Sequence, residues 1–214
     1  MKDLWKEYKK AVFEVFNFEE ENTWAEWEGK KLSLKAKTYL GKHIIKSREA
    51  EIWSDKSCIY NNIIYPKTGA KYLKEGVPCF GMDLMGFFEK KVIIVFDFQH
   101  PKPNYLFTTP FLSQTKTNIR FFEPGNHFSS HAFVVKCTAN EVQNHLETFK
   151  DYLKVYSHIL YSNEPTGDDT SQYADFDAYM RALDPVAGYL KSNFGAEKSE
   201  DFVNKFLFTY YVHP

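Results

Sequence analysis

The segment from Val92 to Phe98, which reads VIIVFDF, restricts the possible folds more than any other stretch of the 214 residues. Its β-branched and aromatic side chains favour a strand. The apolar run is nearly continuous and does not alternate with polar residues, so both faces of this strand should be covered. The segment therefore predicts a sheet that lies between two helical layers.

Helical periodicity occurs on both sides of the middle part of the chain. Residues 4–16 place apolar side chains at helical spacing with lysines and glutamates between them, which predicts an amphipathic N-terminal helix. The same spacing recurs from Asn140 to Leu160 and from Asp175 to Phe194. Ser199 is expected to cap a closing helix.

Short stretches typical of strands fill the middle of the chain, between Lys31 and Tyr65, from Tyr105 to Thr108 and from Ala132 to Lys136. They follow one another without intervening helices, which favours an antiparallel sheet. We therefore predict one α/β domain over residues 1–214, a three-layer α/β/α sandwich with a central antiparallel sheet.

Charge and cysteine usage argue against several classes of protein. The formal net charge is -1, so no overall field attracts nucleic acid or an anionic membrane. Cys58, Cys79 and Cys137 are widely separated and form no Cys-x-x-Cys pair, so no zinc or iron–sulfur site is expected. Without a signal peptide or an apolar run as long as a membrane span, a reducing, cytoplasmic location is expected.

The remaining chemistry lies in carboxylates with apolar neighbours, since no dinucleotide, phosphate-loop, zinc-protease or serine-hydrolase motif is present. Asp83, Asp97 and Asp184 each interrupt an apolar stretch. Desolvation raises the pKa of a carboxyl group, which makes a proton donor at neutral pH. A structural role is the alternative for each of them. Asp184, for example, could cap a helix that begins at Pro185, and Asp97 could hydrogen-bond a neighbouring loop.

Aromatic residues make up 18% of the chain. This proportion suits a pocket for a flat apolar ligand, although an aromatic-rich core would give the same count. The residues alone therefore indicate a candidate acid in an aromatic domain and do not indicate its substrate.

Separated blocks over nearly the whole chain carry a family resemblance. They are Tyr60–Asn61 with Ile64–Gly69, Pro78–Met85, Lys90–Pro101, Arg120–Glu123 with Gly125–Phe128, Tyr173–Tyr189 and Ser199–Phe208. Matches this long and this separated are specific. The chain resembles the ferredoxin-dependent bilin reductases, and within them the phycoerythrobilin synthases of marine cyanophages.

The resemblance implies an α/β/α sandwich with the bilin between the sheet and the C-terminal helices. It makes Asp83 the central acid that protonates the substrate and Asp184 a second acid on the opposite side of the pigment. Asn61 stands where the phycocyanobilin-forming members carry a histidine, which favours phycoerythrobilin chemistry. Lys136 and Arg120 are candidate partners of the bilin propionates, with a solvated surface charge as the alternative for each.

The implied reaction is a four-electron reduction of biliverdin IXα to phycoerythrobilin through 15,16-dihydrobiliverdin, by way of bilin radicals. A [2Fe-2S] ferredoxin would supply the electrons to a monomeric enzyme without a bound cofactor, and Asp side chains would supply protons. Two alternatives remain open. One is a two-electron reductase that stops at 15,16-dihydrobiliverdin, and the other is a non-enzymatic bilin carrier.

Overall fold

A computed structural model describes residues 3–67, 77–87, 91–100, 109, 112, 127–162, 164–165, 173–183 and 186–209. Its centre is a seven-stranded sheet in which every strand lies antiparallel to its neighbour in the chain. The strands are β1 (Glu20–Glu28), β2 (Ser33–Gly41), β3 (Ile44–Trp53), β4 (Ser57–Pro66), β5 (Cys79–Phe87), β6 (Lys91–Gln99) and β7 (Phe133–Cys137). The predicted antiparallel sheet is confirmed.

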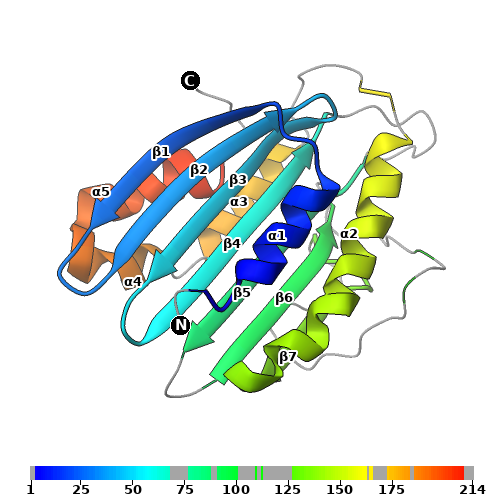
Figure 1. Cartoon of the computed structure of the whole chain (residues 1–214). Coiled ribbons are helices and arrows are strands. Elements are labelled where there is room, and N and C mark those ends of the chain that lie inside the picture. Colours follow the sequence, from blue (N-terminus) through cyan, green and yellow to red (C-terminus); the bar gives the residue numbers. More distant parts are fainter. Residues whose placement is uncertain are drawn as a thin grey trace.

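Helices cover both faces of this sheet (Figure 1). One face carries α1 (Lys6–Val15) and α2 (Leu146–Tyr161), the latter preceded by the 3-10 helix η2 (Ala139–His145). The opposite face carries α3 (Ala174–Leu183), α4 (Val186–Phe194), α5 (Ala196–Asp201) and the π-helix η4 (Phe202–Leu207). The three-layer α/β/α sandwich predicted from the sequence is therefore confirmed.

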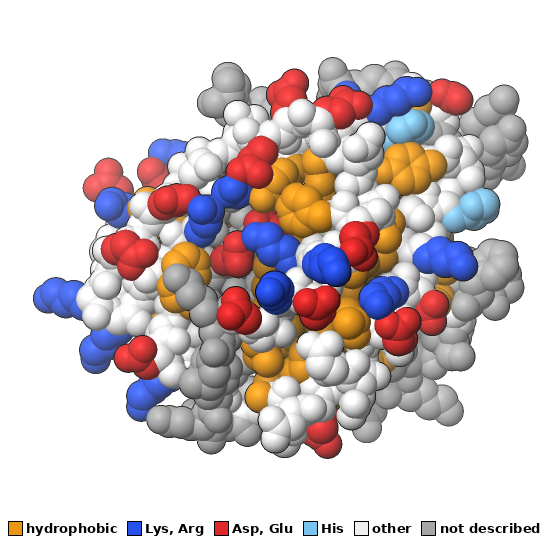
Figure 2. All heavy atoms as spheres, viewed as in Figure 1, with side chains coloured by type: hydrophobic (Ala, Val, Ile, Leu, Met, Phe, Trp, Pro, Cys, Tyr) orange, Lys and Arg blue, Asp and Glu red, His pale blue; other side chains and the backbone are white. Residues whose placement is uncertain are grey.

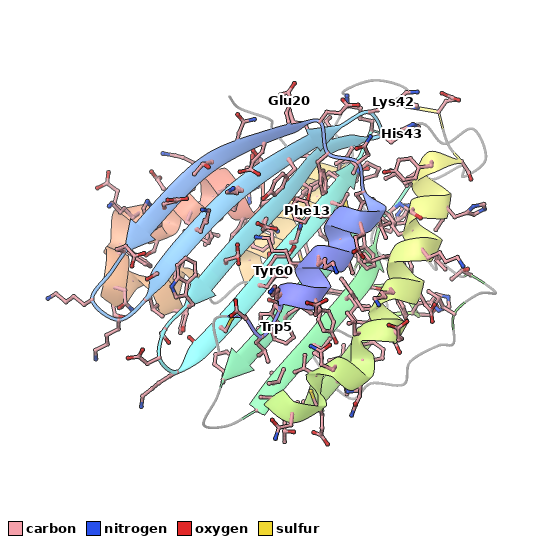
Figure 3. All side chains as sticks on the ribbon, in the orientation of Figure 1. Trp5, Phe13, Glu20, Lys42, His43 and Tyr60 are labelled. Carbon is pink, nitrogen blue, oxygen red and sulfur yellow. The ribbon has the colours of Figure 1, made fainter. Side chains whose placement is uncertain are left out.

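Strand alternation assigns each residue of β4 to one of the two helical layers. Tyr60 lies on the α1 face, where it shares a core with Trp5 and α2 (Figure 3). The Trp5 indole donates a 2.8 Å hydrogen bond to the carbonyl oxygen of Cys58, which fixes the start of α1 on the sheet. Because successive side chains point to opposite faces, Asn61 faces the C-terminal helices.

The second core lies between strands β1–β3 and the C-terminal helices. Ala50 and Ile52 of β3 share it with Phe202 and Phe206 of η4. The ring planes of these two phenylalanines are nearly parallel, with centroids 5.3 Å apart. This packing holds the last helical segment over the sheet.

Two strands differ from the sequence-based expectation. β1 begins at Glu20, before the predicted sheet region, and is mostly exposed because it forms one edge of the sheet. β5 reads CFGMDLMGF and lacks β-branched residues, yet it lies fully inside the sheet between β4 and β6. The expected strand from Tyr105 to Thr108 falls outside the described residues.

The predicted capping role of Ser199 is wrong. Helix α5 begins at Ala196, so Ser199 lies within it. The buried Ser199 hydroxyl donates a 2.6 Å hydrogen bond to the carbonyl oxygen of Gly195, one turn earlier. Gly195 is the residue that precedes the helix, with a positive φ of 87°.

Acidic and basic side chains are interspersed on the face that carries α1 and α2 (Figure 2). Several form ion pairs, such as Lys9 with Glu51 at 2.6 Å and Lys35 with Glu26 at 2.6 Å. In the part of the chain that the structure describes, no helix is both long enough and apolar enough to cross a membrane.

Candidate active site

A cavity of about 330 Å³ lies between the sheet and the C-terminal helices. Strands β3 to β6 form its floor, while Met180 of α3, Val186 and Tyr189 of α4, and Phe208 after η4 form its walls. The Tyr189 and Ser57 hydroxyl groups lie 3.0 Å apart in a hydrogen bond that links α4 to β4. The cavity has the size and the mostly apolar lining of a small-molecule site.

Asp83 and Asn61 meet on the floor of this cavity. They are direct partners in the pairing of β4 with β5, so their side chains lie next to each other on the same face. Both line the cavity and both are half-buried. Two of the candidate residues named from the sequence are therefore adjacent in space.

Arg48 is a cavity residue that the sequence reasoning missed. It extends from β3, is 1% exposed, and donates a 2.9 Å hydrogen bond from Nη1 to the side-chain oxygen of Asn61. Its guanidinium carbon also lies 5.2 Å from the centre of the Phe208 ring. Since β3 reads REAE at this point, with charges on both faces, the sequence does not distinguish this buried arginine from its neighbours.

A buried polar cluster beside Arg48 joins β3 and β4 to α3. The Tyr65 hydroxyl donates a 2.7 Å hydrogen bond to the Asp177 carboxylate, and Lys46 lies 5.1 Å from the Tyr65 ring centre. Burial lowers the pKa of Lys46 to about 7. Burial raises the pKa of Asp177, while Tyr65, Lys46 and Arg48 oppose that rise. The cluster holds α3 against the sheet and so fixes the cavity wall that Met180 forms.

Asp97 is fully buried on β6 and does not line the cavity. Its carboxylate accepts hydrogen bonds from Ser129, at 2.8 Å from the backbone N–H and 2.5 Å from the hydroxyl. Burial raises the pKa of Asp97 to about 7, although the Ser129 hydrogen bonds lower it. This contact is the neighbouring-loop hydrogen bond that the sequence left open as the structural alternative.

The other candidate residues are not brought together in the described structure. Lys136 lies on the edge strand β7 and is exposed. It pairs with Ile93, so its side chain points to the cavity face of the sheet, but it does not line the cavity. Asp184 and Arg120 lie outside the described residues. Asp184 stands in the chain between Met180 and Val186, which both line the cavity.

Comparison with known proteins assigns the chain to a family. Residues 11–209 match the ferredoxin-dependent bilin reductase family. The chain belongs to this family of oxidoreductases. The predicted family membership is thereby confirmed.

Curated relatives carry a more specific name, 15,16-dihydrobiliverdin:ferredoxin oxidoreductase. The protein of that name from Gloeobacter violaceus is 27% identical over 70% of this chain and 67% of its own length. The Nostoc punctiforme protein is 26% identical over 79% of this chain and 76% of its own length. The Parasynechococcus marenigrum protein is 29% identical over 72% of each chain.

The fold is also that of a solved structure, phytochromobilin synthase from tomato in complex with biliverdin. The TM-score is 0.67 at 18% sequence identity, and the match covers 96% of this chain and 82% of the tomato protein. This similarity supports the three-layer fold.

Proposed function

We propose that this protein binds biliverdin IXα in the cavity beneath the C-terminal helices and reduces it to 15,16-dihydrobiliverdin with electrons from ferredoxin. The observation that carries the proposal is the position of Asp83 on the floor of a mostly apolar cavity, beside Asn61. The name of the curated relatives and the biliverdin complex of the tomato protein support the same substrate and electron donor.

The cavity suits the chemistry of a linear tetrapyrrole. Met85, Met180 and Phe208 offer apolar surface to a flat conjugated pigment. The pigment itself can accept single electrons and spread the resulting charge over its conjugated system. The protein then has to hold the pigment in place and deliver protons to chosen carbon atoms.

Asp83 is the proposed proton donor. Saturating the C15–C16 double bond consumes two electrons, from two molecules of reduced ferredoxin, and two protons. A carboxyl group fixed at one point of the floor selects which carbon receives a proton. Because Asp83 is only half-buried, water can return a proton to it between steps.

A second candidate reaction continues to phycoerythrobilin. The observation in its favour is that the chain keeps a second acid, Asp184, between the two cavity-lining helices α3 and α4. Two further electrons and two further protons would reduce the A-ring diene, with Asp184 as the donor. The name shared by the curated relatives favours the two-electron reaction.

Anaerobic turnover of biliverdin IXα with reduced ferredoxin, followed by chromatography of the products, tests both candidates. We expect 15,16-dihydrobiliverdin as the first product, formed with two electrons for each biliverdin consumed. Its accumulation under excess reductant identifies the two-electron enzyme, whereas its conversion to phycoerythrobilin identifies the four-electron enzyme. Bound biliverdin that stays unreduced would contradict both and indicate a carrier.

A further inference from the structure

Gln99 is a buried carboxamide at the cavity that none of the proposed steps uses. It ends strand β6, is 7% exposed and lines the same cavity as Asp83. In the described part of the chain, no hydrogen bond holds this carboxamide. Its donor and acceptor groups are therefore open to a ligand in the cavity.

The Gln99 side chain lies in a space that Gly81 leaves free. Gln99 is paired with Cys79, but its carboxamide reaches along β5 and lies over Gly81. A Cβ atom on Gly81 would be 2.5 Å from Gln99 Cδ and 2.8 Å from Nε2, which is too close unless the carboxamide moves away. The missing side chain of Gly81 therefore allows the carboxamide to occupy this position.

The orientation of the Gln99 side chain brings its carboxamide toward Asp83. Gly81 and Asp83 are two residues apart on one strand, so they share a face at a spacing of about 7 Å. The carboxamide and the Asp83 side chain thus lie side by side on the cavity floor.

We propose that Gln99 is a substrate-positioning residue that pairs with a terminal lactam of the bilin and holds the neighbouring carbon bridge beside Asp83. A lactam presents one N–H donor and one C=O acceptor side by side. A primary carboxamide presents the complementary acceptor and donor, so the two groups can form a paired hydrogen bond. This inference rests on the proposed function. It adds the paired hydrogen bond that fixes the position of the bilin along the cavity floor.

Four variants test the inference, each measured by titration with biliverdin and by the visible spectrum of the bound pigment. Gln99→Met keeps the length of the side chain and removes the carboxamide. Gly81→Ala keeps Gln99 and displaces it, at small cost to the fold because the displaced group is the end of a flexible side chain. Gln99→Ala and the Gly81→Ala/Gln99→Ala pair complete a double-mutant cycle.

We expect Gln99→Met and Gly81→Ala each to weaken biliverdin binding about tenfold and to shift the bound spectrum. In the Gln99→Ala background, Gly81→Ala should have no further effect, because no carboxamide remains to be displaced. Urea unfolding of each variant separates lost binding from lost stability. An equal effect of Gly81→Ala in both backgrounds would overturn the inference.

Wild-type turnover with reduced ferredoxin, measured in the same series, keeps the two proposals distinct. A wild type that does not reduce biliverdin removes the proposed function. A wild type that does so while Gln99→Met and Gly81→Ala match its affinity, spectrum and product removes only the role of Gln99.

Discussion

The Arg48 guanidinium donates a 2.9 Å hydrogen bond to the side-chain oxygen of Asn61. Because a guanidinium can only donate, this contact fixes the orientation of the Asn61 carboxamide and turns its NH₂ group away from Arg48. Asn61 is in turn the cross-strand partner of Asp83. Arg48 therefore determines how Asn61 presents a hydrogen-bond donor beside the proposed acid.

Arg48→Met should weaken biliverdin binding about tenfold and shift the spectrum of the bound pigment, because Asn61 loses the group that orients it. Titration with biliverdin at fixed ionic strength measures both effects. Arg181→Met, at an exposed arginine of α3, is the matched control and should bind as the wild type does. Equal affinity and equal spectra for the two variants would show that Arg48 has no part in pigment binding.

Asp184→Asn should keep forming 15,16-dihydrobiliverdin at the wild-type rate and should lose any phycoerythrobilin that the wild type makes. Asparagine is itself a good N-cap, so this substitution removes the proton and leaves the capping interaction in place. Product chromatography under excess reductant checks the outcome, with Asp175→Asn in the first turn of α3 as control. Phycoerythrobilin formed by Asp184→Asn at the normal rate would exclude Asp184 from the chemistry.

Asp97 should make stability depend on pH. Its carboxyl titrates near pH 4 in the unfolded chain and at about 7 in the folded protein. Between these values the folded protein holds a proton that the unfolded chain has released, so its contribution to stability falls as pH rises. One such proton changes the free energy of unfolding by up to about 1.4 kcal/mol per pH unit.

Urea unfolding of the wild type and of Asp97→Asn at pH 5 and pH 7.5 measures this contribution, because other titrating groups cancel in the difference. The destabilisation caused by Asp97→Asn should be larger at pH 5 than at pH 7.5. A difference that stays the same at the two pH values would show that the Asp97 pKa is close to its ordinary value.

The sequence predicted the layers of the fold because its apolar patterns are strong. The continuous run from Val92 to Phe98 required cover on two faces, and β6 is covered by α2 on one face and by Met180 of α3 on the other. β5 was not predicted as a strand because it contains two glycines and an aspartate, which have low strand propensity, and no β-branched residue. Its place in the sheet comes from pairing with β4 and β6, and such pairing is a tertiary effect.

The candidate site could be predicted only in part. Asp83 was identified because a charge stands in an apolar stretch, and Asn61 because of the family resemblance. Arg48 and Gln99 were missed because a charged or polar residue in a strand is usually solvated. Only strand register and the missing side chain of Gly81 show that these two face the cavity.

The most direct test of the central claim is a single-turnover reduction of biliverdin bound to Asp83→Asn, followed by electron paramagnetic resonance and absorption spectroscopy. The amide keeps the shape of the side chain but cannot donate a carboxyl proton. We expect biliverdin to bind as in the wild type, a long-lived bilin radical to accumulate, and reduced pigment to be absent or nearly so. Asp55→Asn, at an exposed turn, should turn over normally. Full conversion to 15,16-dihydrobiliverdin by Asp83→Asn, at the wild-type rate and without a persistent radical, would contradict the assignment of Asp83 as the proton donor.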